Sequence, residues 1–251
     1  MIFYYSGCGN SRFIATSIAE ELNDKLVFIP EAQRNNQYEY ELSEGEMLGF
    51  VYPIYSWRPP HLVEEFVEKL KINGTPSYVW IAVTCGDNVG LTEKIFRKEL
   101  EIIGLNLNAA FCFKMPNTYV NMIGMSVDRE EVANEKIAKA KEKLPTVIDL
   151  IKSHADYSDM IKGAFPRFKS NVIGSGFYKW ASDEPFFSTD ACVSCGMCAK
   201  VCPMQNITLG NGRPMWHGNC NTCDACYHHC PKHAIQYGKK TRGKGQYFFK
   251  V

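Results

Sequence analysis

The stretch CVSCGMCAKVCP at residues 192–203 returns as CNTCDACYHHCP at residues 220–231. Both copies follow the pattern C-x2-C-x2-C-x3-C-P, and an isoleucine follows each at the same offset, at Ile207 and Ile235. An internal repeat of this kind indicates two similar half-domains related by pseudo-symmetry. Because eight of the 11 cysteines of the chain lie in these two copies, they decide how this region folds.

The spacing of these cysteines is that of bacterial iron–sulfur proteins. The first three thiolates of each copy are separated by two residues and can wrap one cubane, whereas the fourth lies too far along and reaches the neighbouring cluster. The proline after each fourth cysteine turns the chain away. We therefore assign one [4Fe-4S] cluster to Cys192, Cys195, Cys198 and Cys230, and the other to Cys220, Cys223, Cys226 and Cys202.

Zinc is the alternative, because CxxC pairs also build tetrahedral zinc sites. Zinc does not explain three evenly spaced cysteines followed by Cys-Pro in both copies, so iron–sulfur clusters are favoured. Residues 188–238 resemble a bacterial-type ferredoxin with two [4Fe-4S] clusters, which implies a small α+β domain that transfers electrons. We interpret the flanking histidines as surface residues rather than as hydrogen-bond donors to the cluster sulfurs; they are His217, His228 and His229.

The composition is that of a soluble globular protein, with 45% hydrophobic and 22% charged residues. No apolar run approaches the ~18 residues of a membrane-spanning helix, so no membrane association is expected. The first residues, MIFYYSGCGN, lack the basic region of a secretory signal, which predicts a cytoplasmic protein. In that compartment, many cysteines indicate metal binding rather than disulfides.

The net charge is +1, but its distribution is uneven. Residues 1–159 contain 16 Lys/Arg and 23 Asp/Glu, whereas residues 160–251 contain 12 and 4. A basic C-terminal half can indicate nucleic-acid binding. Two clusters with four thiolates each carry roughly two negative charges apiece and offset about half of the basic excess, so we expect no nucleic-acid partner. We interpret residues 239–251 as a basic tail that is solvated or used for docking.

Short apolar strands alternate with amphipathic helices over residues 1–155, which predicts a parallel sheet covered on both faces. Five strands suit a small doubly wound α/β domain. Residues 156–187 are rich in Gly and Pro and are expected to connect the two domains irregularly. The predicted strands are Ile2–Tyr5, Val27–Ile29, Leu48–Tyr52, Tyr78–Thr84 and Ala109–Phe113, and the predicted helices are Ser11–Leu22, Leu62–Leu70, Leu91–Ile103 and Glu130–Lys152.

Three polar loops follow the first, third and fourth predicted strands, where open parallel sheets bind ligands. The first loop runs into a helix N-terminus, whose free N–H groups and dipole favour phosphate. It lacks the lysine of a P-loop and the third glycine of a dinucleotide-binding loop, which favours a single phosphate. The candidate binding residues are Ser6, Gly7, Cys8, Gly9, Asn10 and Ser11 in the first loop, Pro53, Tyr55 and Trp57 in the second, and Thr84, Cys85, Gly86, Asp87 and Asn88 in the third.

The order and spacing of these elements resemble flavodoxin. In that family the first loop holds the phosphate of FMN, the second lays an aromatic ring against the flavin, and the third hydrogen-bonds the pyrimidine edge. The first loop matches the family pattern at Ser6, Gly9, Asn10 and Ser11, whereas Cys8 replaces the usual threonine and removes one hydroxyl donor. The resemblance implies a flavodoxin-like, doubly wound, five-stranded sheet that binds FMN.

The second loop offers Trp57 for stacking on the flavin. The third loop lacks the tyrosine that covers the opposite flavin face in many flavodoxins. That face is either open to a substrate, or covered by Tyr119, or covered by the residues around Phe177–Trp180.

The whole chain thus resembles flavodoxin–ferredoxin fusion proteins. The resemblance implies electron transfer between two [4Fe-4S] clusters and FMN, with redox proteins as donor and acceptor. Two alternatives stay open: a flavin-dependent reductase of a small molecule that uses the clusters as a relay, and a ferredoxin whose N-terminal domain has lost flavin and serves for docking. No acid/base pair stands out, so the sequence does not decide whether the chain is an enzyme.

Overall fold

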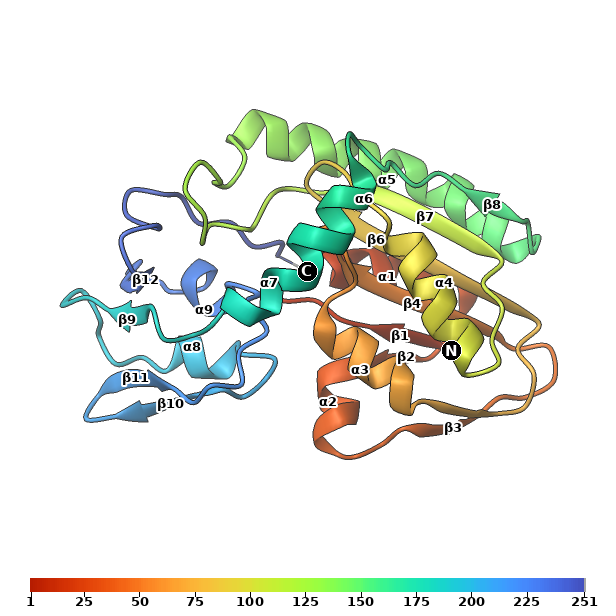
Figure 1. Cartoon of the computed structure of the whole chain (residues 1–251), viewed down its shortest axis with the longest axis horizontal. Helices are drawn as coiled ribbons and strands as arrows, with labels where there is room; N and C mark the ends of the chain where they lie inside the picture. Colours follow the sequence, from red (N-terminus) through yellow and green to blue (C-terminus); the bar gives the residue numbers. More distant parts are fainter. Residues whose placement is uncertain (251) are drawn as a thin grey trace.

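A computed structural model describes residues 1–250, apart from the side chains of Tyr178 and Trp180. Its N-terminal part is a sheet of parallel strands (Figure 1). The five predicted strands are all present, but a sixth, very short strand from the connecting segment lengthens the sheet by one edge. In spatial order the strands are β2 (Leu26–Phe28), β1 (Ile2–Tyr4), β4 (Met47–Pro53), β6 (Tyr78–Cys85), β7 (Ala109–Lys114) and β8 (Tyr157–Ser158).

The order of the strands reverses next to β1. The chain passes from β1 to β2 on one side, and then crosses to β4 on the other side, so the connections after β1 and β4 leave in opposite directions. In doubly wound sheets a crevice opens at this point, at the carboxyl ends of the strands. The fold therefore brings the loops after β1, β4 and β6 to one edge.

Helices cover both faces of the sheet, as the alternation predicted. On one face, α1 (Asn10–Leu22) and α5 (Glu130–Lys152) pack on a core that includes Trp80, whose ring lies against Gly49 of β4. Pro145 lies inside α5 and does not interrupt it. On the other face of the sheet the core is rich in phenylalanine. The helices of that second face are α2 (Ile29–Arg34), α3 (His61–Lys69) and α4 (Thr92–Ile102).

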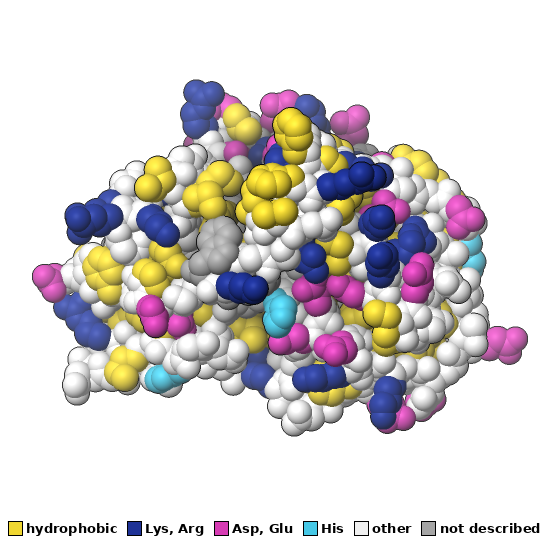
Figure 2. Space-filling model, in the orientation of Figure 1, with side chains coloured by type: hydrophobic (Ala, Val, Ile, Leu, Met, Phe, Trp, Pro, Cys, Tyr) yellow, Lys and Arg dark blue, Asp and Glu magenta, His cyan; other side chains and the backbone are white. Residues whose placement is uncertain are grey.

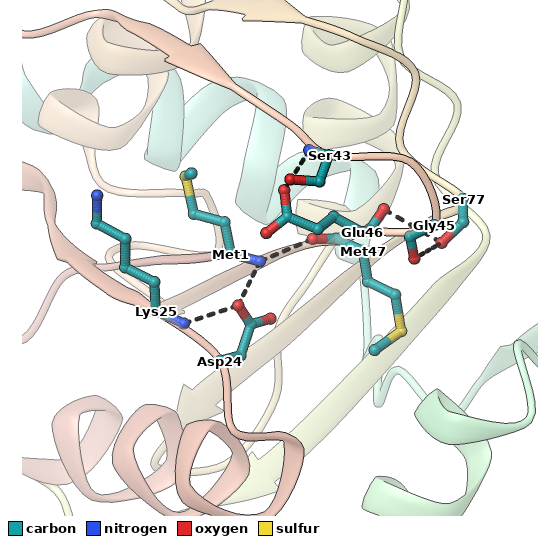
Figure 3. A network of polar contacts seen from close by, with 8 residues as sticks. All are labelled: Met1, Asp24, Lys25, Ser43, Gly45, Glu46, Met47 and Ser77. Carbon is teal, nitrogen blue, oxygen red and sulfur yellow. Dashed lines mark hydrogen bonds and ion pairs between the residues drawn. The ribbon is translucent and has the colours of Figure 1, made fainter.

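Polar contacts fix the opposite edge of the sheet (Figure 3). The Met1 amine donates to the Met47 carbonyl (2.9 Å) and forms an ion pair with Asp24 (2.5 Å). Ser77 Oγ donates to the Gly45 carbonyl at 2.8 Å.

A small parallel pair of strands, β3 (Glu39–Glu41) and β5 (Lys71–Asn73), lies outside the main sheet and was not predicted.

The connecting segment is helical in its middle part, at residues 166–180, which was not predicted. It forms α6 (Pro166–Phe168), the π-helical turn η1 (Lys169–Gly174) and α7 (Ser175–Trp180), which run between the sheet and the C-terminal module (Figure 1). Several apolar side chains of this segment are exposed, among them Phe165 (79%), Phe168 and Val172, and Figure 2 shows hydrophobic side chains gathered over α6.

The C-terminal module has two antiparallel strand pairs and two single-turn helices. Three equivalent pairs of residues have left-handed backbones: Ser194 and Thr222, Gly196 and Asp224, and Gln205 and His233. The pseudo-symmetry that the repeat predicted is therefore present in the backbone. The elements are β9 (Phe186–Ser188) paired with β12 (Ile235–Tyr237), β10 (Ile207–Gly210) paired with β11 (Arg213–Trp216), α8 (Met197–Lys200) and α9 (Ala225–His228).

The basic tail does not extend into solvent. It returns to the first loop of the N-terminal domain, where the Phe249 N–H donates to the Cys8 carbonyl (2.8 Å) and the Phe249 ring stacks on Phe13 (4.5 Å between centroids). Tyr247 Oη lies 3.2 Å from Asn10 Oδ1. Within residues 1–250, no helix combines the length and the apolar character needed to cross a membrane.

Candidate functional site

The first group of four cysteines surrounds a small cavity. Residues Cys192, Cys195, Cys198 and Cys230 line a space of about 20 Å³, so the fourth cysteine comes from the other copy of the repeat. Cys195 is exposed and Cys198 is buried. The ligand set assigned from the sequence is thus brought together around one space.

The second group lies deeper in the protein. Burial raises the pKa of the Cys226 thiol well above its usual range, and the nearby charges of Cys223, Cys220 and Cys202 raise it further. Cys202 is therefore a spatial neighbour of the second copy, as the crossover requires. The same two causes, burial and the Cys202 charge, act on Cys223, whose pKa is raised to about 12.

Backbone N–H groups point at several of these sulfurs. Asn206 N donates to Cys202 Sγ (3.4 Å) and Ala234 N donates to Cys230 Sγ (3.2 Å), at equivalent positions of the two copies. Thr222 N donates to Cys220 Sγ at 3.3 Å. Such bonds stabilise thiolates and set the potential of a bound cluster. The donor set therefore fits two [4Fe-4S] clusters. Among the described residues, no group of three or more acidic, Cys or His side chains is arranged tightly enough to hold a single metal ion.

A second, much larger cavity of about 480 Å³ lies at the carboxyl edge of the sheet. All three predicted loops line it, with Gly9 as the one predicted residue that does not. The rest of its wall comes from regions far apart in the chain, and of these residues only Tyr119 and Phe177 were predicted from the sequence. These further lining residues include Met115–Tyr119, Met122, Met125, Lys169, Phe177 and Thr222–Asp224.

The first loop offers both backbone and hydroxyl donors. Ser6 Oγ accepts from Gly9 N (3.1 Å), which leaves its O–H able to donate to a ligand. Ser11 Oγ pairs with Thr84 Oγ1 (2.8 Å). Gly9 is left-handed (φ 93°) and turns the chain into α1. The first N–H groups of a helix have no intrahelical acceptor, and the first turn of α1 has no acidic residue that would repel an anion.

The same loop packs directly on the C-terminal module. A Cβ on Gly7 would lie 2.6 Å from Cys223 Cβ, and the Cys8 thiol donates to the Cys223 carbonyl at 3.3 Å. These contacts explain two residues of the loop. Because Gly7 has no side chain, the loop that carries Cys223 can approach it closely. Cys8, which stands where flavodoxins usually have a phosphate-binding threonine, instead contacts the C-terminal module through its thiol.

The second loop has a constrained backbone. Ser56 and Trp57 both have positive φ angles (47° and 61°), which side-chain-bearing residues adopt only when neighbouring structure holds them there. Lys169 Nζ lies 5.2 Å from the centroid of the Trp57 ring. Tyr55 Oη lies 3.3 Å from Tyr5 Oη, and the Tyr5 hydroxyl acts to lower the pKa of the Cys223 thiol. A polar path therefore joins the second loop to a cysteine of the deeper group.

The third loop is backed by Asn117. A Cβ on Gly86 would overlap the Asn117 side chain, so only glycine fits there. Asn117 itself is held by Asp128, which accepts from its N–H at 2.9 Å. Tyr119 and Phe177 meet edge to face, with 6.0 Å between ring centroids, and both line the cavity. The two predicted covers of the open flavin face thus lie together at one wall.

Asp224 is a buried carboxyl group at the cavity wall. It is 1% exposed, and it accepts from Asn121 Nδ2 (2.5 Å) and from Val120 N (3.4 Å). Burial raises its pKa to about 7. Two buried polar atoms of the lining, Thr222 Oγ1 and Asn88 Oδ1, have no hydrogen-bond partner among the described residues. Orphaned polar atoms at a cavity wall fit a polar ligand, and with the aromatic rings they fit a flavin.

His228 is not the surface residue that we expected. It is 2% exposed, its Nε2 lies 2.6 Å from the Thr118 carbonyl, and its Nδ1 accepts from Tyr247 N at 3.2 Å. Burial lowers its pKa to about 4. This neutral ring therefore joins the C-terminal module, the tail and the loop beside the cavity.

Eight thiols in two crossed groups define an iron–sulfur electron-transfer domain of the ferredoxin-like kind at the end of the chain. Comparison with known families agrees, since the profile of a family described as a 4Fe-4S dicluster domain matches residues 191–235. Among curated proteins, none matches the chain. The chain is thus an α/β domain with a parallel sheet, joined to a 4Fe-4S dicluster domain.

Proposed function

We propose that the chain is an iron–sulfur flavoprotein that transfers electrons between its two [4Fe-4S] clusters and FMN bound in the large cavity. The N-terminal domain would then be flavodoxin-like. In support of this, its five longer strands have the order 2-1-3-4-5 in chain numbering, which is the flavodoxin order, and in that order the ligand site lies at the switch point next to the first strand.

One observation carries the proposal. The cavity that the three loops line has Cys223, a cluster ligand, in its wall. A flavin there would lie beside the second cluster, without intervening protein, and electrons would pass over a short distance. A bound flavin supplies chemistry that the clusters lack, because it exchanges two electrons whereas each cluster exchanges one.

The residues of the chain would have separate roles in holding FMN. The N–H groups of the first loop and of the start of α1 would bind the phosphate. Trp57 and the Tyr119–Phe177 pair would enclose the ring. The third loop and the orphaned Asn88 Oδ1 and Thr222 Oγ1 would accept or donate hydrogen bonds at polar edges of the ligand.

The first cluster would exchange electrons with redox partner proteins. Cys195 is exposed, and Val193, two residues before it, is 57% exposed. Lys200 and Lys232 are exposed on the same module, and Lys232 lines the small cavity of the first cysteine group. An apolar centre with lysines favours an acidic carrier protein. Electrons would then pass from partner to first cluster, second cluster and flavin, or in the reverse order.

Cofactor stoichiometry on protein purified without air tests this function. We expect about eight iron atoms, about eight sulfide ions and about one FMN per chain, as two [4Fe-4S] clusters and one flavin require. The clusters should give a broad absorption shoulder near ~400 nm. Iron and sulfide without flavin, together with no uptake of added FMN, would instead support the flavin-free docking domain.

A flavin-dependent reductase is the second candidate. Tyr119, Cys85 and Asn88 all line the cavity, and Met122 and Met125 at its wall are partly exposed (39% and 38%), so a small molecule could reach a bound flavin. Steady turnover of a small-molecule acceptor by the purified protein, without a partner protein, would favour the reductase over the carrier.

A further inference from the structure

The connecting segment joins two of the cavity loops through one hydroxyl group. Ser170 is fully buried; its Oγ–H donates to the Trp57 carbonyl (2.9 Å), and its Oγ accepts from the Leu91 N–H (2.8 Å). Trp57 belongs to the loop after β4, and Leu91 follows the loop after β6. Ser170 therefore fixes both loops to the segment that crosses them.

Close contacts hold this segment in one position. A Cβ on Gly90 would lie 2.4 Å from Ser170 Oγ, and a Cβ on Gly174 would lie 2.4 Å from the Ser56 carbonyl oxygen. The turn between Ser170 and Gly174 is π-helical, a rare form that often marks functional sites. Residues 170–174 of the segment therefore pack closely against the second and third loops.

This position brings Lys169 to the cavity. Its Nζ lies over the Trp57 ring, and among the lining residues that the structure describes it is the only cation. None of the ion pairs found between described residues includes Lys169. Its charge is therefore available to an anionic group in the cavity, and its neighbour there is the loop expected to face the flavin ring.

We propose that Lys169 stabilises the reduced flavin and thereby raises the potential of the flavin relative to the two clusters. This inference rests on the FMN site proposed above. Each reduced cluster releases one electron, and the two electrons enter the ring with one proton from water, which leaves one negative charge there. The oxidised ring is neutral, so a nearby ammonium group favours the reduced form selectively. Ser170 is a positioning residue that keeps Lys169 beside Trp57.

The test compares flavin potentials in the full-length, cluster-loaded protein. Anaerobic spectroelectrochemical titration of wild type is compared with Lys169→Met, Lys169→Arg and Lys162→Met. Lys162 is the matched control, because it is an exposed lysine of the same segment that does not line the cavity. Titrations with FMN and with riboflavin, which lacks the phosphate, accompany each variant.

We expect Lys169→Met to weaken binding of reduced relative to oxidised flavin by about five- to tenfold, as for loss of one partly exposed charge, and so to lower the flavin potential. Lys169→Arg and Lys162→Met should stay near wild type. The shift should be equal with riboflavin. Ser170→Ala should move the potential in the same direction by a smaller amount.

An unchanged potential in Lys169→Met overturns the inference. Loss of FMN affinity with riboflavin affinity retained also overturns it, because Lys169 would then bind the phosphate. Wild-type protein that takes up no flavin would refute the proposed function itself, and this outcome is recognised before any variant is compared. If Lys169→Met is poorly folded, Lys169→Gln replaces it in the same titrations.

Discussion

The Trp57 backbone is held at the cavity because its carbonyl accepts a hydrogen bond from Ser170 Oγ and its Cβ packs closely on Gly90. We expect Trp57→Ala to weaken FMN binding by ~1–3 kcal/mol, because a large aromatic contact with the ring is lost. Fluorescence titration of FMN measures the dissociation constant. Phe168→Ala is the control, since Phe168 is 58% exposed and does not line the cavity. Equal affinities in the two variants would contradict a stacking role for Trp57.

Tyr5 joins the second loop to the deeper cluster through its hydroxyl group. We expect Tyr5→Phe to lower the potential of the cluster bound by Cys220, Cys223, Cys226 and Cys202. The loss of one hydrogen bond to sulfur corresponds to about 1 kcal/mol, or roughly 40 mV for a one-electron couple.

A redox titration followed by EPR separates the two clusters in this variant. The other cluster should be unaffected, and Tyr4→Phe serves as the control, because Tyr4 packs on Phe28 at the neighbouring strand. If both clusters shift together in Tyr5→Phe, the effect is a general change in structure and not the loss of one bond.

Residues that act with their chain neighbours can be predicted from the sequence. The cysteine spacing predicts two crossed ligand groups, and the four cysteines of one group line a single small cavity. The loop composition predicted about half of the lining of the large cavity. Cys8, interpreted only as a lost hydroxyl donor, contacts Cys223, 215 positions away in the sequence. Lys169 and Thr222 reach the cavity through comparable long-range packing. No local pattern encodes such contacts, so the contact of Cys8 was missed and Lys169 and Thr222 were not predicted.

Among the elements, the tail has the clearest testable role. The ring of Phe249 stacks on Phe13 of α1, and such a pair contributes about 0.5–1.5 kcal/mol. We expect Phe249→Ala to speed amide hydrogen exchange in the first turn of α1 by roughly two- to tenfold, because the tail no longer covers it. Hydrogen exchange followed by mass spectrometry measures this, with the exposed Lys239→Ala as control. Unchanged exchange would show that the backbone bond to Cys8 alone holds the tail.

Elements with strong internal patterns were predicted, and elements that depend on their surroundings were not. The apolar runs of the five long strands and the amphipathic spacing of α1, α3, α4 and α5 identify them in the sequence. The edge strand β8 has two residues, and η1 is stabilised by contacts with the second and third loops. Neither has enough local signal, because its stability comes from the rest of the fold.

At the scale of the whole molecule, the crossed ligand groups that we predict would connect the two halves of the dicluster domain. We expect Cys202→Ala to abolish the cluster held by Cys220, Cys223 and Cys226, leaving about half of the iron and the other cluster intact. Iron analysis and EPR of the reduced protein measure this outcome. Cys198→Ala is the matched variant and should remove the first cluster instead. Loss of the first cluster in Cys202→Ala would show that the ligand groups are not crossed.

Because the loop that carries Cys223 is also a wall of the large cavity, the two kinds of prosthetic group are expected to be acquired together. Without iron, residues 222–224 would lose the iron–thiolate bond that holds them in place, and the large cavity would lose one of its walls. Cells starved of iron should therefore accumulate protein depleted in both, although the flavin contains no metal. Equal flavin content in protein from iron-starved and iron-replete cultures would show that the two loading steps are independent.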